Sequence, residues 1–140
     1  MKQNVPVLTI MTKNVIKLNL ADDLTKAERL FKKHPIRHIP VVNGNVIVGM
    51  LSYTDLLRIS FADAVDEDEE TIDVTVYNMF SIEQVMARNL VKVEPETSIK
   101  EVAEILSKRE FHALPVVQGD LLVGIVTTTD LIKYLIEQYN

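Results

Sequence analysis

The chain has 140 residues and a mass of 15.9 kDa, with 15 basic and 20 acidic side chains and a net charge of −5. This length fits one compact domain or two half-size units that share a core. The absence of cysteine excludes disulfides, a cysteine nucleophile and thiolate metal sites, and a pI near 5.2 argues against broad nucleic-acid binding, which needs a cationic face.

The first half of the chain predicts the order β-α-β-β-α. Its elements are a strand at Val15–Leu18, a helix capped by Asp22 or Asp23, strands at Ile39–Val42 and Val46–Leu51, and a helix that begins at Ser52. The joint Asn43-Gly44-Asn45 between the two later strands is typical of a tight hairpin. Because those strands are continuously apolar rather than alternating, we expect helices to cover both faces of the sheet.

A composition break follows the first half. Six carboxylates and no cation fall within the eight residues Asp63–Glu70. A solvated loop is the simpler interpretation, and a divalent-cation site is the alternative, although the run lacks the spaced ligands and turning glycine of a calcium loop. Thr71–Phe80 then predicts an irregular or short extended connector, and Phe80–Met86 a capped turn of helix.

The second half repeats the first at an offset of 75 residues, without a gap. Of the 50 aligned pairs that begin at Ile10 and Val85, 13 are identical, where average composition predicts about 3. The repeated elements are a strand at Leu90–Val93, a helix capped by Thr97 or Ser98, a hairpin around Gln118-Gly119-Asp120 and a helix that begins at Thr127. We therefore expect a first repeat with the N-terminal segment at 1–62, a connector at 63–80 and a second repeat at 81–140.

The motifs around the paired strands resemble those of the CBS domain, named from cystathionine β-synthase. The first copy has Arg37-His38-Ile39-Pro40-Val41-Val42 and Gly49–Asp55, and the second has Phe111–Val117 and Gly124–Asp130. The resemblance covers about Ile10 to Tyr134 apart from the acidic connector. It implies an α/β (α+β) fold in which two β-α-β-β-α repeats pack sheet against sheet about a pseudo-twofold axis.

The resemblance also implies a function. CBS pairs bind AMP, ADP, ATP or S-adenosylmethionine in clefts between the repeats, and binding regulates an enzyme, transporter or channel. A free-standing pair looks like a non-catalytic sensor for an adenine nucleotide that acts on a separate partner protein, and such pairs commonly form homodimers. No catalytic cofactor is implied.

The family pattern G-h-x-[ST]-x-x-D occurs once in each copy. By resemblance, Ser52 and Thr127 match the hydroxyl that contacts phosphate, and Asp55 and Asp130 match the carboxylate that accepts both ribose hydroxyls. The chemistry is reasonable, because a helix N-terminus attracts anions and a carboxylate can accept from two hydroxyls together. Each motif also fits a helix capping box, so the ligand role and the capping role both stay open.

A basic residue three positions before each central proline completes the implied site. Arg37 and His112 occupy the position where family members often place a phosphate partner. The alternatives are a surface ion pair for Arg37 and a packed core residue for His112. We expect one high-affinity site per chain, on the Arg37 side. The residues expected against adenine or closing the pocket are Ile39, Val41, Leu114, Val116, Thr12, Ile16 and Val91.

The sequence gives no sign of a zinc site, a membrane span or a secretory signal. The three histidines have no recognisable zinc spacing, so we expect no metal site. The apolar runs span six residues at most, as in Val46–Leu51, and Met1–Thr12 is too weak for a secretory signal, so we expect a cytoplasmic protein without membrane contact. The apolar residues near both termini indicate core closure or, alternatively, a helix–helix dimer surface; they are Val5, Val7, Leu8, Ile10, Tyr134, Leu135, Ile136 and Tyr139.

Two other functions compete with the sensor. One is a structural dimerisation module whose nucleotide clefts are vestigial. The other is an enzyme such as a nucleotide hydrolase, which is the weaker hypothesis because the sequence has no P-loop, no paired catalytic carboxylates within a motif and no Ser/His/Asp arrangement.

Overall fold

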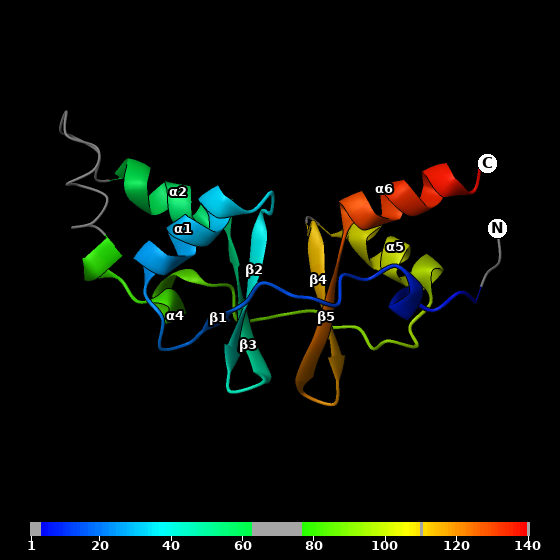
Figure 1. Ribbon diagram of the computed structural model, residues 1–140, viewed down its shortest axis with the longest axis horizontal. Coiled ribbons are helices and arrows are strands. Elements are labelled where there is room, and N and C mark those ends of the chain that lie inside the picture. The colour runs from blue at the N-terminus through cyan, green and yellow to red at the C-terminus, as the bar shows by residue number, and fades with distance from the viewer. Residues whose placement is uncertain (1–3, 63–76, 110, 140) are drawn as a thin grey trace. The chain divides into compact units, whose positions relative to one another are not determined.

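The computed structural model describes residues 4–62, 77–109 and 111–139 (Figure 1). The acidic run 63–70 lies outside these residues, as does most of the connector predicted at 71–80, of which 77–79 are helical rather than extended. The elements in chain order are the 3₁₀ turn η1 (Val7–Thr9), β1 (Leu18–Asn19), α1 (Leu24–Lys33), β2 (His38–Asn43), β3 (Val46–Ser52), α2 (Tyr53–Ala62), α4 (Ile82–Val85), α5 (Ile99–Lys108), β4 (Ala113–Gln118), β5 (Leu121–Thr127) and α6 (Thr128–Glu137). None of the described helices is long and apolar enough to cross a membrane.

The predicted caps and hairpins are confirmed. Asp23 caps α1 and Ser98 caps α5, each accepting a hydrogen bond from a backbone N–H three residues later. Gly44 and Gly119 follow the first strand of each hairpin with φ of 68° and 65°, a conformation that L side chains rarely adopt. Ser81 caps α4 in a reciprocal capping box, as the capped turn predicts.

The first strand of each repeat is much shorter than predicted. Leu18 and Asn19 pair in parallel with β2, while Val15–Leu18 was expected to form the strand. In the second repeat only Val93 makes the equivalent parallel bridge, to Val116. In the first repeat the paired stretch also lies later in the chain than predicted, because Leu18 and Asn19 pair with Val41 and Val42 and the Leu20 N–H donates to the Val42 carbonyl.

The contacts divide the chain into two compact units that cross the repeat boundaries. Of the described residues, the first-repeat unit holds Ile16–Gly44 and those from Val48 to Asn89. The second-repeat unit holds those up to Val15, the short piece Asn45–Ile47 and those from Leu90 onward. From the sequence, we expected the N-terminal segment to belong to the first repeat and residues 81–89 to belong to the second. The contacts group each of these segments with the other repeat.

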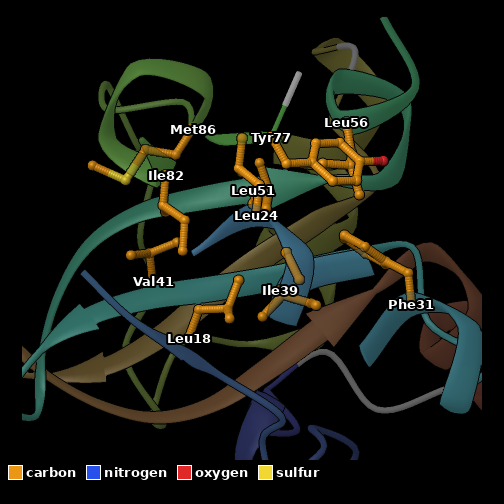
Figure 2. Packing of buried hydrophobic residues seen from close by; sticks show 11 residues of the cluster. Leu18, Leu24, Phe31, Ile39, Val41, Leu51, Leu56, Tyr77, Ile82 and Met86 are labelled. Carbon is orange, nitrogen blue, oxygen red and sulfur yellow. The ribbon is translucent and has the colours of Figure 1, made fainter. Parts of the chain in front are cut away.

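In the first-repeat unit, β1, β2 and β3 form a sheet and α1, α2 and α4 complete the core (Figures 1 and 2). Four successive residues of β2, Ile39–Val42, are buried, and since neighbouring side chains face opposite sides of a sheet, both faces of this strand are covered. Tyr77 is 4% exposed in the same core, and its hydroxyl donates a hydrogen bond to the Glu28 carboxylate. The core residues of this unit that are 0% exposed are Leu18, Leu24, Ala27, Ile39, Val41, Leu51 and Ile82.

In the second-repeat unit, β4 and β5 pair as an antiparallel hairpin from Ala113↔Thr127 to Gln118↔Leu121. Val46, at the start of β3, belongs to this unit and pairs with Leu121 of β5. The N-terminal segment is built into this unit, since Val7 is fully buried and its N–H donates to the Thr97 carbonyl at 2.7 Å. Figure 1 shows this blue segment beside α5.

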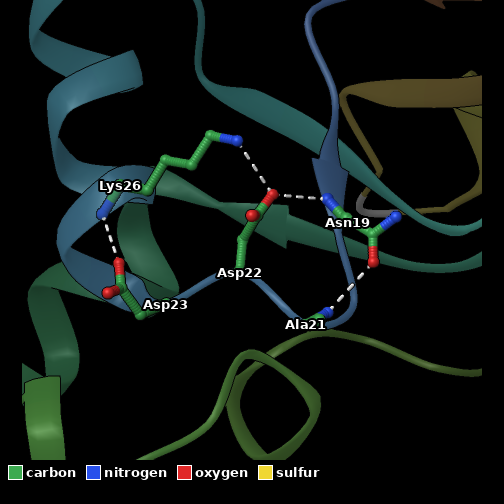
Figure 3. Close-up of polar contacts among 5 residues, drawn as sticks. All are labelled: Asn19, Ala21, Asp22, Asp23 and Lys26. Atoms are coloured by element: carbon green, nitrogen blue, oxygen red, sulfur yellow. Dashed lines mark hydrogen bonds and ion pairs between the residues drawn. The ribbon is translucent and has the colours of Figure 1, made fainter.

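A compact polar network begins α1 (Figure 3). Asp22 accepts hydrogen bonds from the Asn19 N–H at 2.8 Å and the Lys26 ammonium at 3.1 Å. Partial burial raises the pKa of Asp22, but these two donors lower it by more, so the pKa lies below its ordinary value of 3.8. Because the folded-state pKa is depressed, Asp22 stabilises the fold above its unfolded-state pKa, and this contribution is lost as the pH falls through the folded-state pKa.

We expect Asp22→Asn to lower the free energy of unfolding at pH 7 by less than about 1 kcal/mol, because the pair is partly exposed to solvent. The difference from wild type should shrink below about pH 4 and vanish near pH 2. Denaturant titrations of both proteins from pH 7 to pH 2 measure this, with the exposed hairpin variant Asp120→Asn as control. A difference that stays constant across the range would contradict the assignment.

Candidate functional site

Three of the predicted residues meet at the N-terminus of α2 in the first-repeat unit. The Ser52 hydroxyl accepts a hydrogen bond from the Asp55 N–H at 3.0 Å. The Arg37 carbonyl, just before β2, accepts one from the Tyr53 N–H at 2.9 Å. We call Arg37, Ser52 and Asp55 the first half-site.

The second-repeat unit repeats this arrangement at the N-terminus of α6. The His112 carbonyl accepts a hydrogen bond from the Thr128 N–H at 3.0 Å, and Thr127 caps the helix by accepting from the Asp130 N–H at 3.2 Å. Asp130 completes the capping box, because its carboxylate accepts from the Thr127 N–H at 2.9 Å. We call His112, Thr127 and Asp130 the second half-site.

A methionine lies over the glycine that precedes each half-site. A Cβ added at Gly124 would come within 2.6 Å of Met11 Sδ, and a Cβ at Gly49 would overlap Met86 in the same way. Close approach of another segment, rather than a special φ, therefore explains the glycine of each motif.

The residues after these methionines pair with the strand that leads into each half-site. Thr12 exchanges two backbone hydrogen bonds with Ile125, at 2.8 and 3.0 Å, and Ala87 does the same with Met50, at 2.9 and 3.0 Å. Ile125 is two residues before Thr127 on β5, so its partner Thr12 lies beside the second half-site. The hydroxyl of Thr12 has no counterpart at Ala87, so the two half-sites differ in the segment that flanks them.

The four residues expected against adenine lie in the cores. Ile39 and Val41 are fully buried in the first-repeat unit, and Leu114 and Val116 are 1% and 0% exposed in the second. Their side chains are used in packing, so only their backbone or a rearranged core is available to a ligand. Of the residues expected to close the pocket, Ile16 and Val91 are half-buried and Thr12 is exposed.

The two half-sites lie within the segments that comparison with known proteins identifies. The family model of the CBS domain matches this chain twice, at residues 7–62 and at residues 82–137. The chain belongs to the CBS domain family. The predicted fold class, a mixed α and β structure made of two CBS repeats, is thereby confirmed.

Relatives of this CBS chain include an uncharacterized protein, MJ1225, of Methanocaldococcus jannaschii, which is 28% identical over 125 residues. The match covers 89% of this chain but 45% of MJ1225, and the crystal structure of that protein superimposes with a TM-score of 0.82 over 96% and 49% of the two chains at 26% identity. The chain therefore spans about half the length of that relative.

Two solved CBS structures match along nearly their whole length. AcuB from Vibrio cholerae is 28% identical, with a TM-score of 0.81 over 96% of this chain and 93% of AcuB. The CBS domain pair of protein MJ0100, solved in complex with 5′-methylthioadenosine and S-adenosyl-L-methionine, is 26% identical, with a TM-score of 0.77 over 97% and 98% of the chains.

The electrostatics of the two CBS half-sites differ. The Arg37 side chain is exposed, and within residues 4–62, 77–109 and 111–139 it forms no ion pair. With the positive end of the α2 helix dipole, it offers positive potential to an anion. The second half-site has His112 there instead, also exposed. In the described part of the chain, no three His, Asp or Glu side chains group as metal ligands.

Two residues of the first CBS repeat were not singled out by the sequence. The Tyr53 ring packs on Phe31 with centroids 5.2 Å apart, which ties the start of α2 to α1. Arg58 pairs with the Asp55 carboxylate at 3.4 Å. The spacing of Asp55 and Arg58 is that of an i,i+3 helix pair, so this contact could have been predicted.

Proposed function

We propose that this protein is a non-catalytic regulatory module that binds an adenosine-containing ligand and signals to a separate protein. The observation that carries the proposal is the repeated half-site, in which a hydroxyl, a carboxylate and a basic residue meet at a helix N-terminus. The MJ0100 pair supports the ligand class, because its two ligands share an adenosine group and its chain aligns with nearly all of this one.

Each group has a chemical role in this proposal. A half-site carboxylate, Asp55 or Asp130, accepts hydrogen bonds from the ribose diol, because an ionised carboxylate offers acceptors and no donor. The helix N–H groups with Ser52 or Thr127 bind a phosphate or another anionic group. Arg37 compensates phosphate charge on a net-acidic protein.

We further propose that two copies associate through α6. Ile132, Leu135 and Ile136 of this helix are 57%, 42% and 58% exposed, and Tyr139 just beyond it is 84% exposed. These positions follow the i, i+3, i+4, i+7 spacing of one apolar helix face, which a second helix of the same kind can cover. The same face favours the second candidate function, a dimerisation module without a ligand.

Titration calorimetry of the intact protein with AMP, ADP, ATP and S-adenosylmethionine, with guanosine nucleotides as controls, separates these two functions. We expect saturable binding of adenosine compounds only. A ligand at 100 times its Kd should also stabilise the fold by about 2.7 kcal/mol in thermal melts. A flat response from folded protein would reject the sensor and favour the dimerisation module.

We expect Arg37→Ala to weaken AMP binding about tenfold while adenosine binding stays within about twofold, because the variant removes one charge-assisted contact to phosphate. His112→Ala is the matched variant in the second half-site and should have a smaller effect on AMP. Equal losses for AMP and adenosine in Arg37→Ala would contradict a phosphate role.

A further inference from the structure

The two equivalent carboxylates have different partners. Asp130 Oδ2 accepts the Thr127 N–H at 2.9 Å, in a part-buried contact that closes the cap of α6. Asp55 Oδ1 instead faces Arg58 Nη1 at 3.4 Å, and its carboxylate makes no other hydrogen bond or ion pair with the described residues. The two helices are otherwise capped alike, by Ser52 in one and Thr127 in the other.

The residue one turn further along the helix also differs between the two copies. Arg58 has a planar guanidinium with several donors and can reach back to a carboxylate three residues earlier. The equivalent residue of α6 is Lys133, which is exposed and forms no ion pair with Asp130 within the described residues. Asp130 instead accepts the Thr127 N–H at the start of its own helix.

The two carboxylates differ in how many acceptor oxygens they leave free for a ligand. A ribose diol brings two donors, so a carboxylate binds it best with acceptors on both oxygens. To offer both oxygens, Asp130 would have to give up its 2.9 Å hydrogen bond to the Thr127 N–H of its own helix. Asp55 has only to leave a long contact to a side chain that is 76% exposed, which solvent screens.

We propose that Arg58 is a positioning residue that keeps Asp55 out of the helix cap, so that Asp55 binds the ribose while Asp130 chiefly caps α6. This inference rests on the proposed function, because it assumes that an adenosine ligand binds at the half-sites. It assigns the two copies of one motif to different tasks, ligand recognition in the first repeat and helix stability in the second.

Asp55→Ala and Asp130→Ala form a matched pair for the test, with AMP and 2′-deoxy-AMP as probes in titration calorimetry. We expect Asp55→Ala to weaken AMP binding about tenfold or more and to bind AMP and 2′-deoxy-AMP alike, with an unchanged melting temperature. Asp130→Ala should lower the melting temperature by about 2 to 4 °C and leave AMP affinity within about threefold.

Equal effects of the two substitutions on AMP binding would overturn the division of tasks while leaving the proposed function intact. Failure of wild-type protein to bind AMP and S-adenosylmethionine would instead reject the proposed function itself. The two failures are therefore distinguishable in one set of titrations.

Variants at the positioning residue test its role separately. Arg58→Ala should reduce the preference for AMP over 2′-deoxy-AMP about fivefold, because Asp55 can then turn into a capping box. Arg58→Lys should behave like Arg58→Ala, since lysine at the matched position of α6 accompanies a closed box. Lys133→Ala is the control and should leave the preference unchanged. An unchanged or increased preference in Arg58→Ala would overturn the role of Arg58.

Discussion

Met11→Ala is expected to lower the free energy of unfolding by about 2 to 4 kcal/mol and to loosen β4 and β5 rather than the strands β2 and β3 of the first-repeat unit. Met11 is 9% exposed and packs over Gly124 in the core of the second-repeat unit, and removing a buried Met side chain leaves a cavity. Amide hydrogen exchange resolved by strand measures this, because exchange reports local opening separately for each unit.

Met86→Ala is the matched control for this prediction. Met86 has the same exposure but packs over Gly49 in the first-repeat unit, so its loss should increase exchange in β2 and β3. If Met11→Ala increased exchange in β2 and β3 while β4 and β5 stayed protected, the grouping of the N-terminal segment with the second repeat would be wrong.

The double substitution Ile132→Asp with Ile136→Asp is expected to weaken self-association by at least about 100-fold. Each isoleucine is more than half exposed in the single chain, so the change should cost the fold itself little. In a dimer both would be buried, and replacing them removes about 2 kcal/mol or more of apolar contact each and introduces unpaired charges. Analytical ultracentrifugation over a concentration series measures the dissociation constant.

Glu137→Ala serves as the control, because Glu137 is exposed on α6 away from the apolar face. It should leave the dissociation constant unchanged within about twofold. A wild-type protein that stays monomeric at high concentration would reject the homodimer. A dimer that survives both aspartates would place the interface elsewhere.

Local sequence was sufficient to predict most of the helices and strands. Asp23 and Ser98 cap helices, and Gly44 and Gly119 turn hairpins, because each depends on the chemistry and backbone freedom of residues within one turn. The first strand of each repeat was the exception. Its extent depends on how many of its residues find partners in β2 or β4, which are distant in sequence, and no local pattern contains that information.

The sequence predicted which residues gather at each half-site, but it did not predict the hydrogen bonds and ion pairs that they form. The motif spacing was enough to bring Ser52 and Asp55 to one helix end, because residues three apart at a helix start share a turn. The same spacing in both copies could not show that Asp55 faces Arg58 while Asp130 closes a cap. That choice depends on side-chain rotamers and on the reach of arginine and lysine.

The sequence by itself determined the duplication, the order of elements in each repeat, the membership of the CBS domain family and the helix ends that carry the half-sites. Tertiary structure alone decided which flanking segment belongs to which repeat. Met11 and Met86 are identical and stand at equivalent positions, so local sequence suits either glycine equally. The fold distinguishes the two methionines, because Met11 packs over Gly124 and Thr12 forms backbone hydrogen bonds with Ile125. These contacts join distant parts of the chain, so local sequence could not predict which glycine each methionine covers.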